Sequence, residues 1–223
     1  MRLSFWIAIR ELESFYGRPV RPASRDPFEL VLFENIAYLV SDDRREKAFR
    51  ELKKRVGLTP ADLLTAPVEQ LAEIAAKGGI FSDLRARRLQ ECARLVRDEF
   101  GGDLRTVLAL DPVKASKALR KFPVVGEPGA DKILLFTGTV PKLAPESNGL
   151  RVLARLGFIQ EHKNYSTMYR TAWEALKNEF GVECPPLIAA HQLLKRHGQE
   201  LCRRAAPRCM ACPLRNFCPS ATS

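Results

Sequence analysis

The sequence lacks any apolar run long enough to span a membrane. It also lacks the apolar core of a secretory signal peptide, because the opening residues 1–13 mix apolar side chains with Arg10, Glu11 and Glu13 in an amphipathic pattern. These two absences argue against an integral membrane protein and against a secreted one. We therefore expect a cytoplasmic protein that has no membrane partner.

The sequence also lacks sustained β-strand alternation, internal repeats and low-complexity tracts. Apolar residues recur at helical spacing instead, which predicts an all-α fold. The expected helices cover residues 1–16, 27–39, 42–56, 84–100, 147–155, 165–180 and 186–197. Two shorter capped helices are expected to begin at Thr59 and Thr65. A chain of 223 residues is long enough for one or two domains.

Acidic residues are too few to balance the basic ones. Lys and Arg number 36 against 26 Asp and Glu, which gives a formal net charge of +10. Such a surplus favours a polyanionic partner, either nucleic acid or an anionic membrane surface. Because net charge alone also suits a basic protein without such a partner, the choice depends on motifs.

Cysteine is scarce through most of the chain, but four of the six cysteines crowd into residues 202–223. These are Cys202, Cys209, Cys212 and Cys218. Disulfides are not expected in a reducing compartment, and thiolates this close repel one another unless a cation neutralises them. The crowding therefore predicts a metal centre, and four sulfur ligands suit either zinc or an iron–sulfur cluster.

A turn rich in proline and glycine, residues 122–130, lies between two segments of helical pattern. Gly126 and Gly129 allow the backbone to approach a ligand closely, and the helix that follows offers unpaired N–H groups at its start. The turn is therefore a candidate anion site. A plain connector between two helices is the alternative interpretation.

The turn and the cysteines together resemble the endonuclease III superfamily of DNA glycosylases. The turn is similar to that family's helix-hairpin-helix motif, L-P-G-V-G-x-x-x-A, and the cysteine spacing 6-2-5 after His197-Gly198 is similar to its [4Fe-4S] loop. The resemblance implies a cluster on the four cysteines, with zinc as the alternative. It also implies DNA phosphate contacts from Val125, Gly126, Gly129, Arg203, Arg204 and Arg208.

Two hairpin positions depart from the family pattern. Val124 stands where the family usually has its first glycine, and we expect its side chain to weaken the contact between the hairpin and a phosphate. Pro128 stands where the lyase-competent members carry a lysine, which puts lyase chemistry in question. A prolyl ring cannot supply the amine that a Schiff base requires.

The adenine glycosylases are the subgroup that the chain resembles most. Residues 27–39 are similar to the pattern P-Y-x-x-W-x-S-E-x-M-L-Q-Q, which implies that Glu34 is the catalytic glutamate. Tyr38 and Leu39 replace the two glutamines of the pattern and are candidates to fill the gap that a flipped nucleotide leaves in DNA. Residues 146–155 are similar to D-G-N-V-K-R-V-L-A-R, which places Glu146 on the catalytic aspartate and Asn148 on the asparagine.

The chemistry explains why two carboxyl groups are wanted. Breaking an N-glycosidic bond produces a poor leaving group and an oxocarbenium-like sugar, so one acid protonates the base and one carboxylate stabilises the cation. We expect Glu34, in an apolar helix, to be the acid and Glu146, at a helix start, to be the carboxylate. The alternatives are a core glutamate paired with an arginine, a helix-cap acid, and core packing for Tyr38 and Leu39.

The resemblance implies a two-domain protein. Residues 26–140 form a helical barrel-like domain with the hairpin, and residues 1–25 with 141–223 form an iron–sulfur domain. The expected function is a monofunctional DNA glycosylase of base excision repair, a monomer near the nucleoid that acts on double-stranded DNA with a lesion or mismatch. The alternatives are a catalytically silent DNA-binding relative and a glycosylase/lyase that uses another lysine, such as Lys132. The target base stays open.

Overall fold

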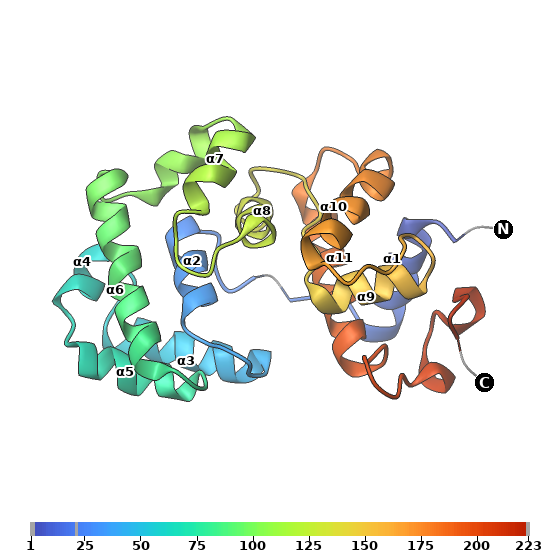
Figure 1. The fold of residues 1–223 in the computed structure, drawn as a ribbon, viewed down its shortest axis with the longest axis horizontal. Coiled ribbons are helices and arrows are strands. Elements are labelled where there is room, and N and C mark those ends of the chain that lie inside the picture. The colour runs from blue at the N-terminus through green and yellow to red at the C-terminus, as the bar shows by residue number, and fades with distance from the viewer. Residues whose placement is uncertain (1–2, 21, 222–223) are drawn as a thin grey trace. The chain divides into compact units, whose positions relative to one another are not determined.

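The computed structural model describes residues 3–20 and 22–221, and every regular element in these ranges is a helix (Figure 1). The expected all-helical architecture is confirmed for this part of the chain. The residues fall into two compact units. We call residues 24–137 the continuous unit, and residues 1–23 with 138–223 the two-segment unit.

The continuous unit contains eight elements: α2 (Pro27–Asn35), α3 (Asp42–Arg55), α4 (Pro60–Thr65), α5 (Val68–Lys77), α6 (Ser82–Glu99), the 3₁₀ helix η1 (Leu104–Ala109), α7 (Pro112–Leu119) and α8 (Glu127–Phe136). The long helix α6 packs on α2, α4 and α5, and α8 packs on α2 and α7. The core is aliphatic, with Leu52, Leu71 and Leu89 fully buried. This packing sets α2 against the hairpin that joins α7 to α8.

The two-segment unit contains α1 (Phe5–Tyr16), α9 (Ser147–Arg155), α10 (Tyr165–Leu176) and α11 (Cys184–Glu200), and three short 3₁₀ helices, η2 (Lys177–Glu179), η3 (Cys209–Ala211) and η4 (Arg215–Phe217). α11 packs on both α9 and α1, although α1 comes from the other end of the chain. The N–H of Phe5 donates to Glu179 Oε2 at 3.0 Å, which ties the start of α1 to η2.

Helix starts follow their capping residues. Ser41 accepts a hydrogen bond from the N–H of Arg44 and caps α3. Thr59 and Asp62 form a reciprocal capping box at α4. The expected capped start at Thr65 is wrong, because α5 begins after Pro67 and has no side-chain cap. Helices α8 and α11 have no side-chain cap but have proline in the first turn, which needs no N–H donor from it.

The helix expected over residues 27–39 is shorter than predicted. α2 ends at Asn35, and Tyr38 and Leu39 lie in an exposed loop. Leu39 has a φ of 54°, a left-handed conformation that no α-helix contains. The apolar pattern was misleading because Ile36 and Ala37 are buried in the loop itself. The apolar character of the residues after Asn35 therefore indicated burial and did not indicate that the helix continues.

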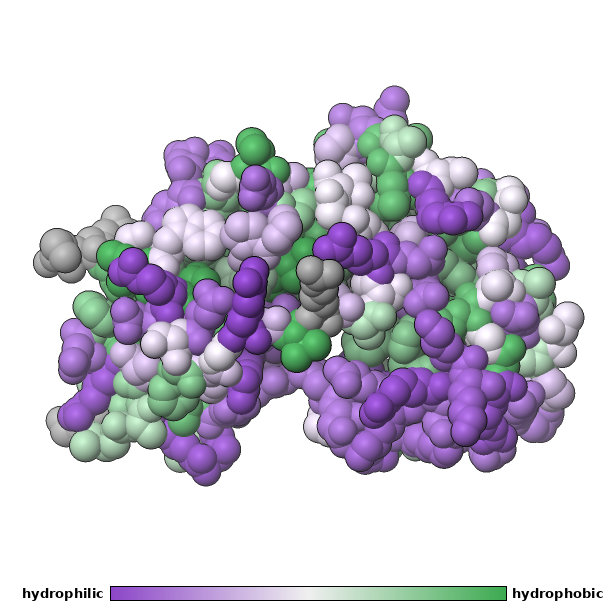
Figure 2. Space-filling view, turned by 180° about the vertical axis from the view of Figure 1, so that it is seen from behind, coloured by the Kyte–Doolittle hydropathy of each residue, from purple (hydrophilic) through white to green (hydrophobic). Residues whose placement is uncertain are grey.

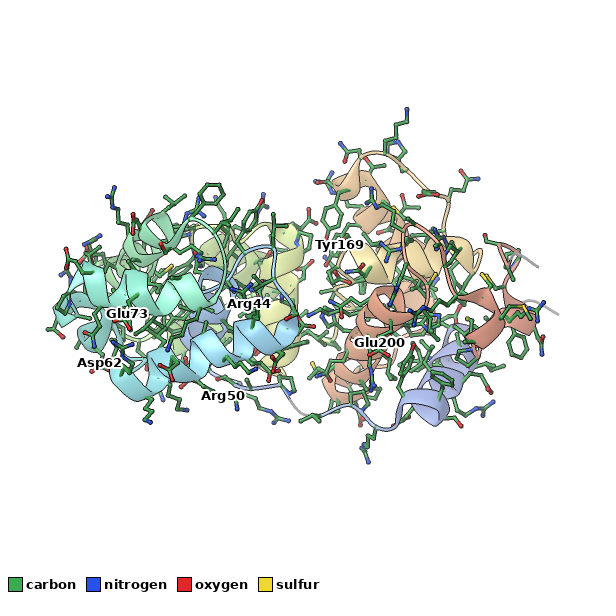
Figure 3. All side chains as sticks on the ribbon, turned by 90° about the horizontal axis from the view of Figure 1, so that it is seen from below. Arg44, Arg50, Asp62, Glu73, Tyr169 and Glu200 are labelled. Carbon is green, nitrogen blue, oxygen red and sulfur yellow. The ribbon has the colours of Figure 1, made fainter. Side chains whose placement is uncertain are left out.

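Charged side chains dominate the surface of α3. Figure 2 shows hydrophilic residues gathered along one edge of the continuous unit, and Figure 3 shows Arg44 and Arg50 on α3. The first turn of α3 begins with Asp42 and Asp43, and its last turn carries Lys53, Lys54 and Arg55, an arrangement of the two ends that favours the helix dipole. Within residues 3–20 and 22–221, no helix combines the length and the apolar character needed to cross a bilayer.

Candidate DNA-processing site

The hairpin between α7 and α8 keeps a backbone conformation that usually requires glycine. Val124 has a φ of 58° and a side chain that is 56% exposed. A β-branched residue in the left-handed region is strained by roughly 1–2 kcal/mol. The hairpin therefore adopts a glycine-type turn although valine stands at the position where the family usually has glycine.

The backbone amides of the hairpin differ in whether an N–H group is left for a ligand. The N–H of Val125 donates to Phe122 O at 3.2 Å, and the Val125 side chain is buried. Gly126 is the N-cap of α8, and Pro128 in the first turn has no N–H to offer. The amides of Gly126 and Gly129 are consequently the better candidates for the predicted phosphate contact, which stays a prediction.

Glu34 lies in the last turn of α2 and contacts the second helix of the hairpin motif. Its Oε1 lies 2.6 Å from Lys132 Nζ, with both side chains about one quarter exposed. The next residue, Asn35, donates from Nδ2 to Pro123 O at 3.1 Å. Arg45 donates to the carbonyls of Phe33 and Glu34 at 3.0 and 3.4 Å and so caps the helix end. Glu34 is thus fixed beside the hairpin, and a lysine takes the place of the arginine partner considered above.

Two loops next to α2, together with the first turn of α6, present an exposed apolar patch, made of Tyr38, Leu39, Ile80, Phe81 and Leu84. Leu39 is 78% exposed and Phe81 is 62% exposed, and both have positive φ. The loops are joined by a bridge between Tyr38 and Gly79, and the Tyr38 and Phe81 rings lie 6.2 Å apart. Strained backbone that supports exposed apolar side chains is typical of a binding surface.

A buried arginine holds this patch in place. The guanidinium of Arg85 is 2% exposed and donates to Gly78 O at 2.8 Å and to Ala75 O and Gly79 O at 2.6 Å each. A Cβ at Gly78 would lie 2.4 Å from Ile36 O, so the loops pack backbone to backbone. Sequence reasoning missed Ile80, Phe81 and Leu84, and the available signal was an apolar pair directly after two glycines in a loop.

Glu146, in the two-segment unit, is the N-cap of α9. Its Oε1 accepts hydrogen bonds from the N–H groups of Asn148 and Gly149, each at 3.0 Å. Its Oε2 accepts a bond of 2.8 Å from Asn148 Nδ2. A carboxylate offers about four acceptor positions, so three of them are used here. The helix-cap interpretation of Glu146 is therefore observed, and the carboxylate is held in one orientation by it.

A chain of hydrogen bonds runs from Glu146 to the cysteine segment. Arg151 Nη2 donates to Asn148 Oδ1 and to Gly198 O, each at 2.7 Å, and Arg151 Nε donates to Cys202 O at 2.9 Å. A Cβ at Gly198 would lie 2.6 Å from Asn148 O, so α11 leaves no space on that side. The Asn148 amide is thereby oriented with its NH₂ toward Glu146.

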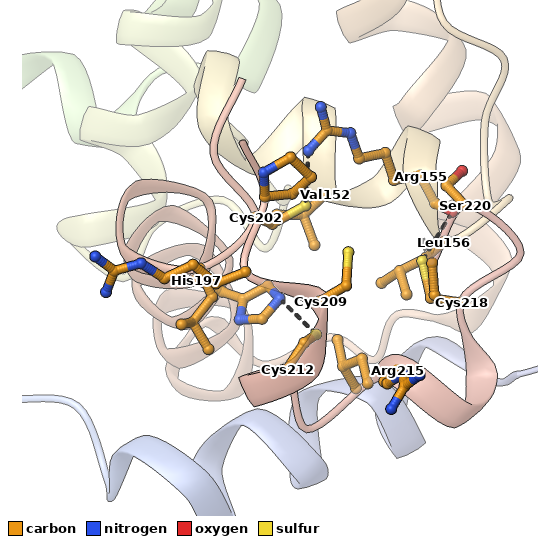
Figure 4. Close-up of a pocket in the computed structure, with 15 residues that line it drawn as sticks. Val152, Arg155, Leu156, His197, Cys202, Cys209, Cys212, Arg215, Cys218 and Ser220 are labelled. Atoms are coloured by element: carbon orange, nitrogen blue, oxygen red, sulfur yellow. Dashed lines mark hydrogen bonds between the residues drawn. The ribbon is translucent and has the colours of Figure 1, made fainter. Parts of the chain in front are cut away.

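The four C-terminal cysteines line one pocket (Figure 4). Burial raises the pKa of Cys212, and the charges of the other three cysteines raise it further. Arg155 Nη1 donates to Cys202 Sγ at 3.5 Å, and Arg155 also donates to the carbonyls of Arg203 and Arg204 at 2.7 and 3.1 Å. Among the described residues, no three His, Cys, Asp or Glu side chains are close enough to bind a single metal ion.

The donor set fits a four-thiolate group. Four cysteines face one space, and each would oppose ionisation of the others unless positive charge lay between them. Apolar side chains of Val152, Leu156 and Leu214 close the pocket around them. The loop also presents Arg203, Arg204 and Arg208 to solvent, which suits the predicted phosphate contacts.

His197 adjoins the cysteines. It is 1% exposed, and burial lowers its pKa to about 4. Its Nε2 lies 3.5 Å from Cys212 Sγ, and its Nδ1 lies 3.1 Å from Tyr16 Oη. Burial also raises the pKa of Tyr16, so its phenol keeps its proton.

The hairpin between two helices, the carboxylates and the cysteine pocket together define a helical base excision repair protein. Comparison with known proteins agrees: the family model described as "HhH-GPD superfamily base excision DNA repair protein" matches residues 40–178. The chain belongs to the HhH-GPD superfamily, as an endonuclease III-like member of the DNA N-glycosylase class. The resemblance expected from the sequence is confirmed.

Individual relatives are distant in sequence but match over most of their length. Endonuclease III of Sulfolobus acidocaldarius is 26% identical over 196 residues, which is 87% of this chain and 82% of that one. The structure of a trapped endonuclease III–DNA covalent intermediate is 22% identical, with a TM-score of 0.77 over 98% of this chain and 97% of that one. A thermostable thymine-DNA glycosylase is 18% identical, with a TM-score of 0.74 over 97% and 96%. The structural matches concern the fold.

Proposed function

We propose that the protein is a monofunctional DNA glycosylase that flips a damaged or mismatched base out of double-stranded DNA and hydrolyses its N-glycosidic bond. The observation that carries the proposal is Pro128 in the first turn of α8, where lyase-competent relatives carry a lysine. A residue without a primary amine cannot form a Schiff base with the sugar. The product is then an intact abasic site and a free base.

The two carboxyl groups take different roles. Glu34 gives a proton to the departing base, which keeps the electron pair of the broken bond. Glu146 stabilises the positive charge on the sugar, and water adds to the anomeric carbon and loses a proton. Because Lys132 occupies Glu34 Oε1, the base must take the place of this lysine before Glu34 can donate a proton to it.

DNA is recognised through charge and through an apolar wedge. Gly126, Gly129 and Asn148 contact the phosphate backbone near the lesion, as do the exposed arginines of the cysteine loop, whereas Val125 supports the hairpin because its N–H is used within the turn. Tyr38 and Leu39 fill the space that the flipped nucleotide leaves, since strained and exposed apolar residues can insert between bases. A protein with a net charge of +10 gains affinity from the release of counterions.

We further propose that Cys202, Cys209, Cys212 and Cys218 hold a [4Fe-4S] cluster. When bound, the cluster supplies the positive charge that stabilises the cysteine loop. Anaerobically purified protein should then be yellow-brown and contain equal amounts of iron and acid-labile sulfide. The variant Cys212→Ala should be bleached and less stable. Stoichiometric zinc without sulfide would support the zinc alternative instead.

A glycosylase with lyase activity is the second candidate, and one observation favours it. Lys132 lies four residues after Pro128, one turn along α8 on the same face, and its amine lies 2.6 Å from the Glu34 carboxylate. An amine at this position could attack the sugar carbon in place of water, with Glu34 accepting the proton that the amine loses. The resulting Schiff base would lead to strand cleavage by β-elimination.

A panel of duplexes with single lesions or mismatches distinguishes the candidates. The monofunctional proposal predicts strand breaks only after alkali and no covalent complex after borohydride reduction. The lyase candidate predicts breaks without alkali and a trapped complex that Lys132→Met abolishes. Lys121→Met is the matched control, because Lys121 also pairs with a glutamate, Glu99, in the continuous unit.

Substitution of the carboxyl groups tests the catalytic assignment. Glu34→Gln keeps the shape but cannot donate a proton, so single-turnover activity should fall by roughly 10²–10⁴-fold with DNA binding retained. Glu146→Gln should cost at least as much. If the wild type binds DNA yet excises no base from any duplex of the panel, the protein is a silent DNA-binding relative and the enzyme proposal is wrong.

A further inference from the structure

A three-residue chain of polar contacts reaches the cysteine pocket from the N-terminal helix. Tyr16 at the end of α1 places its Oη 3.1 Å from His197 Nδ1, and His197 Nε2 lies 3.5 Å from Cys212 Sγ. The two rings are nearly perpendicular, at 70°, with centroids 5.9 Å apart. Figure 4 shows the His197–Cys212 contact at the pocket wall.

The chemistry of the two ends fixes the direction of this chain. A cysteine thiolate that binds iron can only accept a hydrogen bond, so Nε2 must carry the imidazole proton. A neutral imidazole has a single N–H, so Nδ1 is then an acceptor, and the Tyr16 hydroxyl donates to it. Each proton in the chain therefore points toward the cysteine.

Tyr16 is itself held firmly. The Arg196 guanidinium lies over its ring at 4.6 Å, and Arg196 Nη1 donates to Tyr16 O at 3.2 Å. The backbone of His197 is fixed independently, because its carbonyl accepts from the N–H groups of Leu201 and Cys202. A change of the Tyr16 hydroxyl alone consequently alters the proton position on His197 and leaves the helices in place.

We propose that Tyr16 is a positioning residue that selects the Nε2–H tautomer of His197, which then donates a hydrogen bond to the Cys212 ligand of the cluster. The inference rests on the proposed [4Fe-4S] cluster. A hydrogen bond to a ligand sulfur stabilises the more negative, reduced cluster more than the oxidised one, and so raises the reduction potential. The pair protects the cluster against loss of an electron to an oxidant.

The protein contains its own reference for the tautomer. His191, which is 5% exposed, places Nδ1 2.7 Å from Ala144 O, and a carbonyl can only accept. His191 must therefore carry its proton on Nδ1, the reverse of the assignment for His197. In ¹⁵N spectra of histidine-labelled, cluster-loaded protein, the two buried rings should show opposite protonation patterns.

The variant Tyr16→Phe removes the hydroxyl and keeps the ring. We expect unchanged iron and sulfide content, a mixed His197 tautomer, a lower cluster potential by voltammetry and faster bleaching by ferricyanide. Tyr169→Phe is the matched control, because Tyr169 is a buried tyrosine of the same unit on α10. It should lower stability without moving the potential.

The outcomes separate this inference from the proposed function. An Nδ1–H tautomer at His197 in iron-loaded wild type overturns the inference and leaves the cluster in place. An unchanged potential and bleaching rate in Tyr16→Phe also overturns it. Protein without iron and sulfide instead overturns the cluster assignment, and the inference fails with it.

Discussion

Arg151→Met offers the sharpest test of how the Glu146 carboxylate is oriented. The change keeps an unbranched, largely apolar stem as far as the position of Nε and removes three hydrogen bonds, to Asn148 Oδ1, Gly198 O and Cys202 O. Bonds from a charged donor are worth about 1.5–3 kcal/mol each when buried. Because Arg151 is only partly buried and water can replace some of them, we expect a loss of roughly 2–4 kcal/mol, or about 4–16 °C in Tm.

Arg151→Met should also lower the rate of base excision. In the wild type, Glu146 Oε2 accepts a hydrogen bond of 2.8 Å from Asn148 Nδ2. Without Arg151, the Asn148 amide can rotate and bring its oxygen toward Glu146 Oε2 instead. A displacement of about 1 Å in a catalytic group can cost on the order of 10²-fold. Single-turnover base excision, measured well below the Tm of the variant, should fall by that order while DNA affinity changes little.

Arg155→Met is the control for this prediction. Arg155 lies one turn further along α9 and bonds to Arg203 O, Arg204 O and Cys202 Sγ, but to no group of Asn148. It should loosen the cysteine loop and weaken DNA binding with little change in the single-turnover rate. Equal rate losses in both variants, or a destabilised Arg151→Met with wild-type rate, would refute the reasoning.

Three further predictions address the Glu146 cap of α9, Val124 in the hairpin, and the exposed apolar patch that contains Leu39 and Phe81. Glu146→Asp should keep or raise the Tm, because aspartate is a better N-cap, yet it should lower the excision rate if the longer side chain is a working catalytic group; an unchanged rate contradicts that role. Val124→Gly should relieve left-handed strain, change unfolding free energy by about 0–2 kcal/mol toward stability and tighten DNA binding in a fluorescence titration; weaker binding contradicts it. Leu39→Ala and Phe81→Ala should weaken binding to lesion duplex with unchanged Tm, since both side chains are exposed.

The elements that the sequence predicted well are those with strong local signals. Residues 147–155 form α9 as expected, because Glu146 caps the start and the apolar stripe is narrow. The end of α2 was misjudged because Ile36 and Ala37 are buried by contacts with the Gly78 region, which lies about forty residues away in the sequence. Burial in a loop that packs on distant backbone leaves no local periodicity to read.

In the candidate site too, some features have a local signal in the sequence and others do not. The grouping of the four cysteines follows from their spacing, whereas the partner of Glu34 does not, because Lys132 meets it only through the packing of α2 on α8. The Arg151 contacts and the Tyr16–His197 contact likewise join segments that are far apart in sequence. Such pairs are products of tertiary packing, and a single sequence carries no signal for them.

The two-segment unit has a consequence for synthesis on the ribosome. Residues 24–137 are contiguous, so this unit can fold as soon as it has emerged. Helix α1 is made before the continuous unit but packs against α11, which is made after it, so Phe5, Ile9 and Leu12 stay without their α11 partners during the synthesis of the residues between the two helices. The apolar face of α1 therefore stays uncovered from the synthesis of that helix until α11 has left the ribosome.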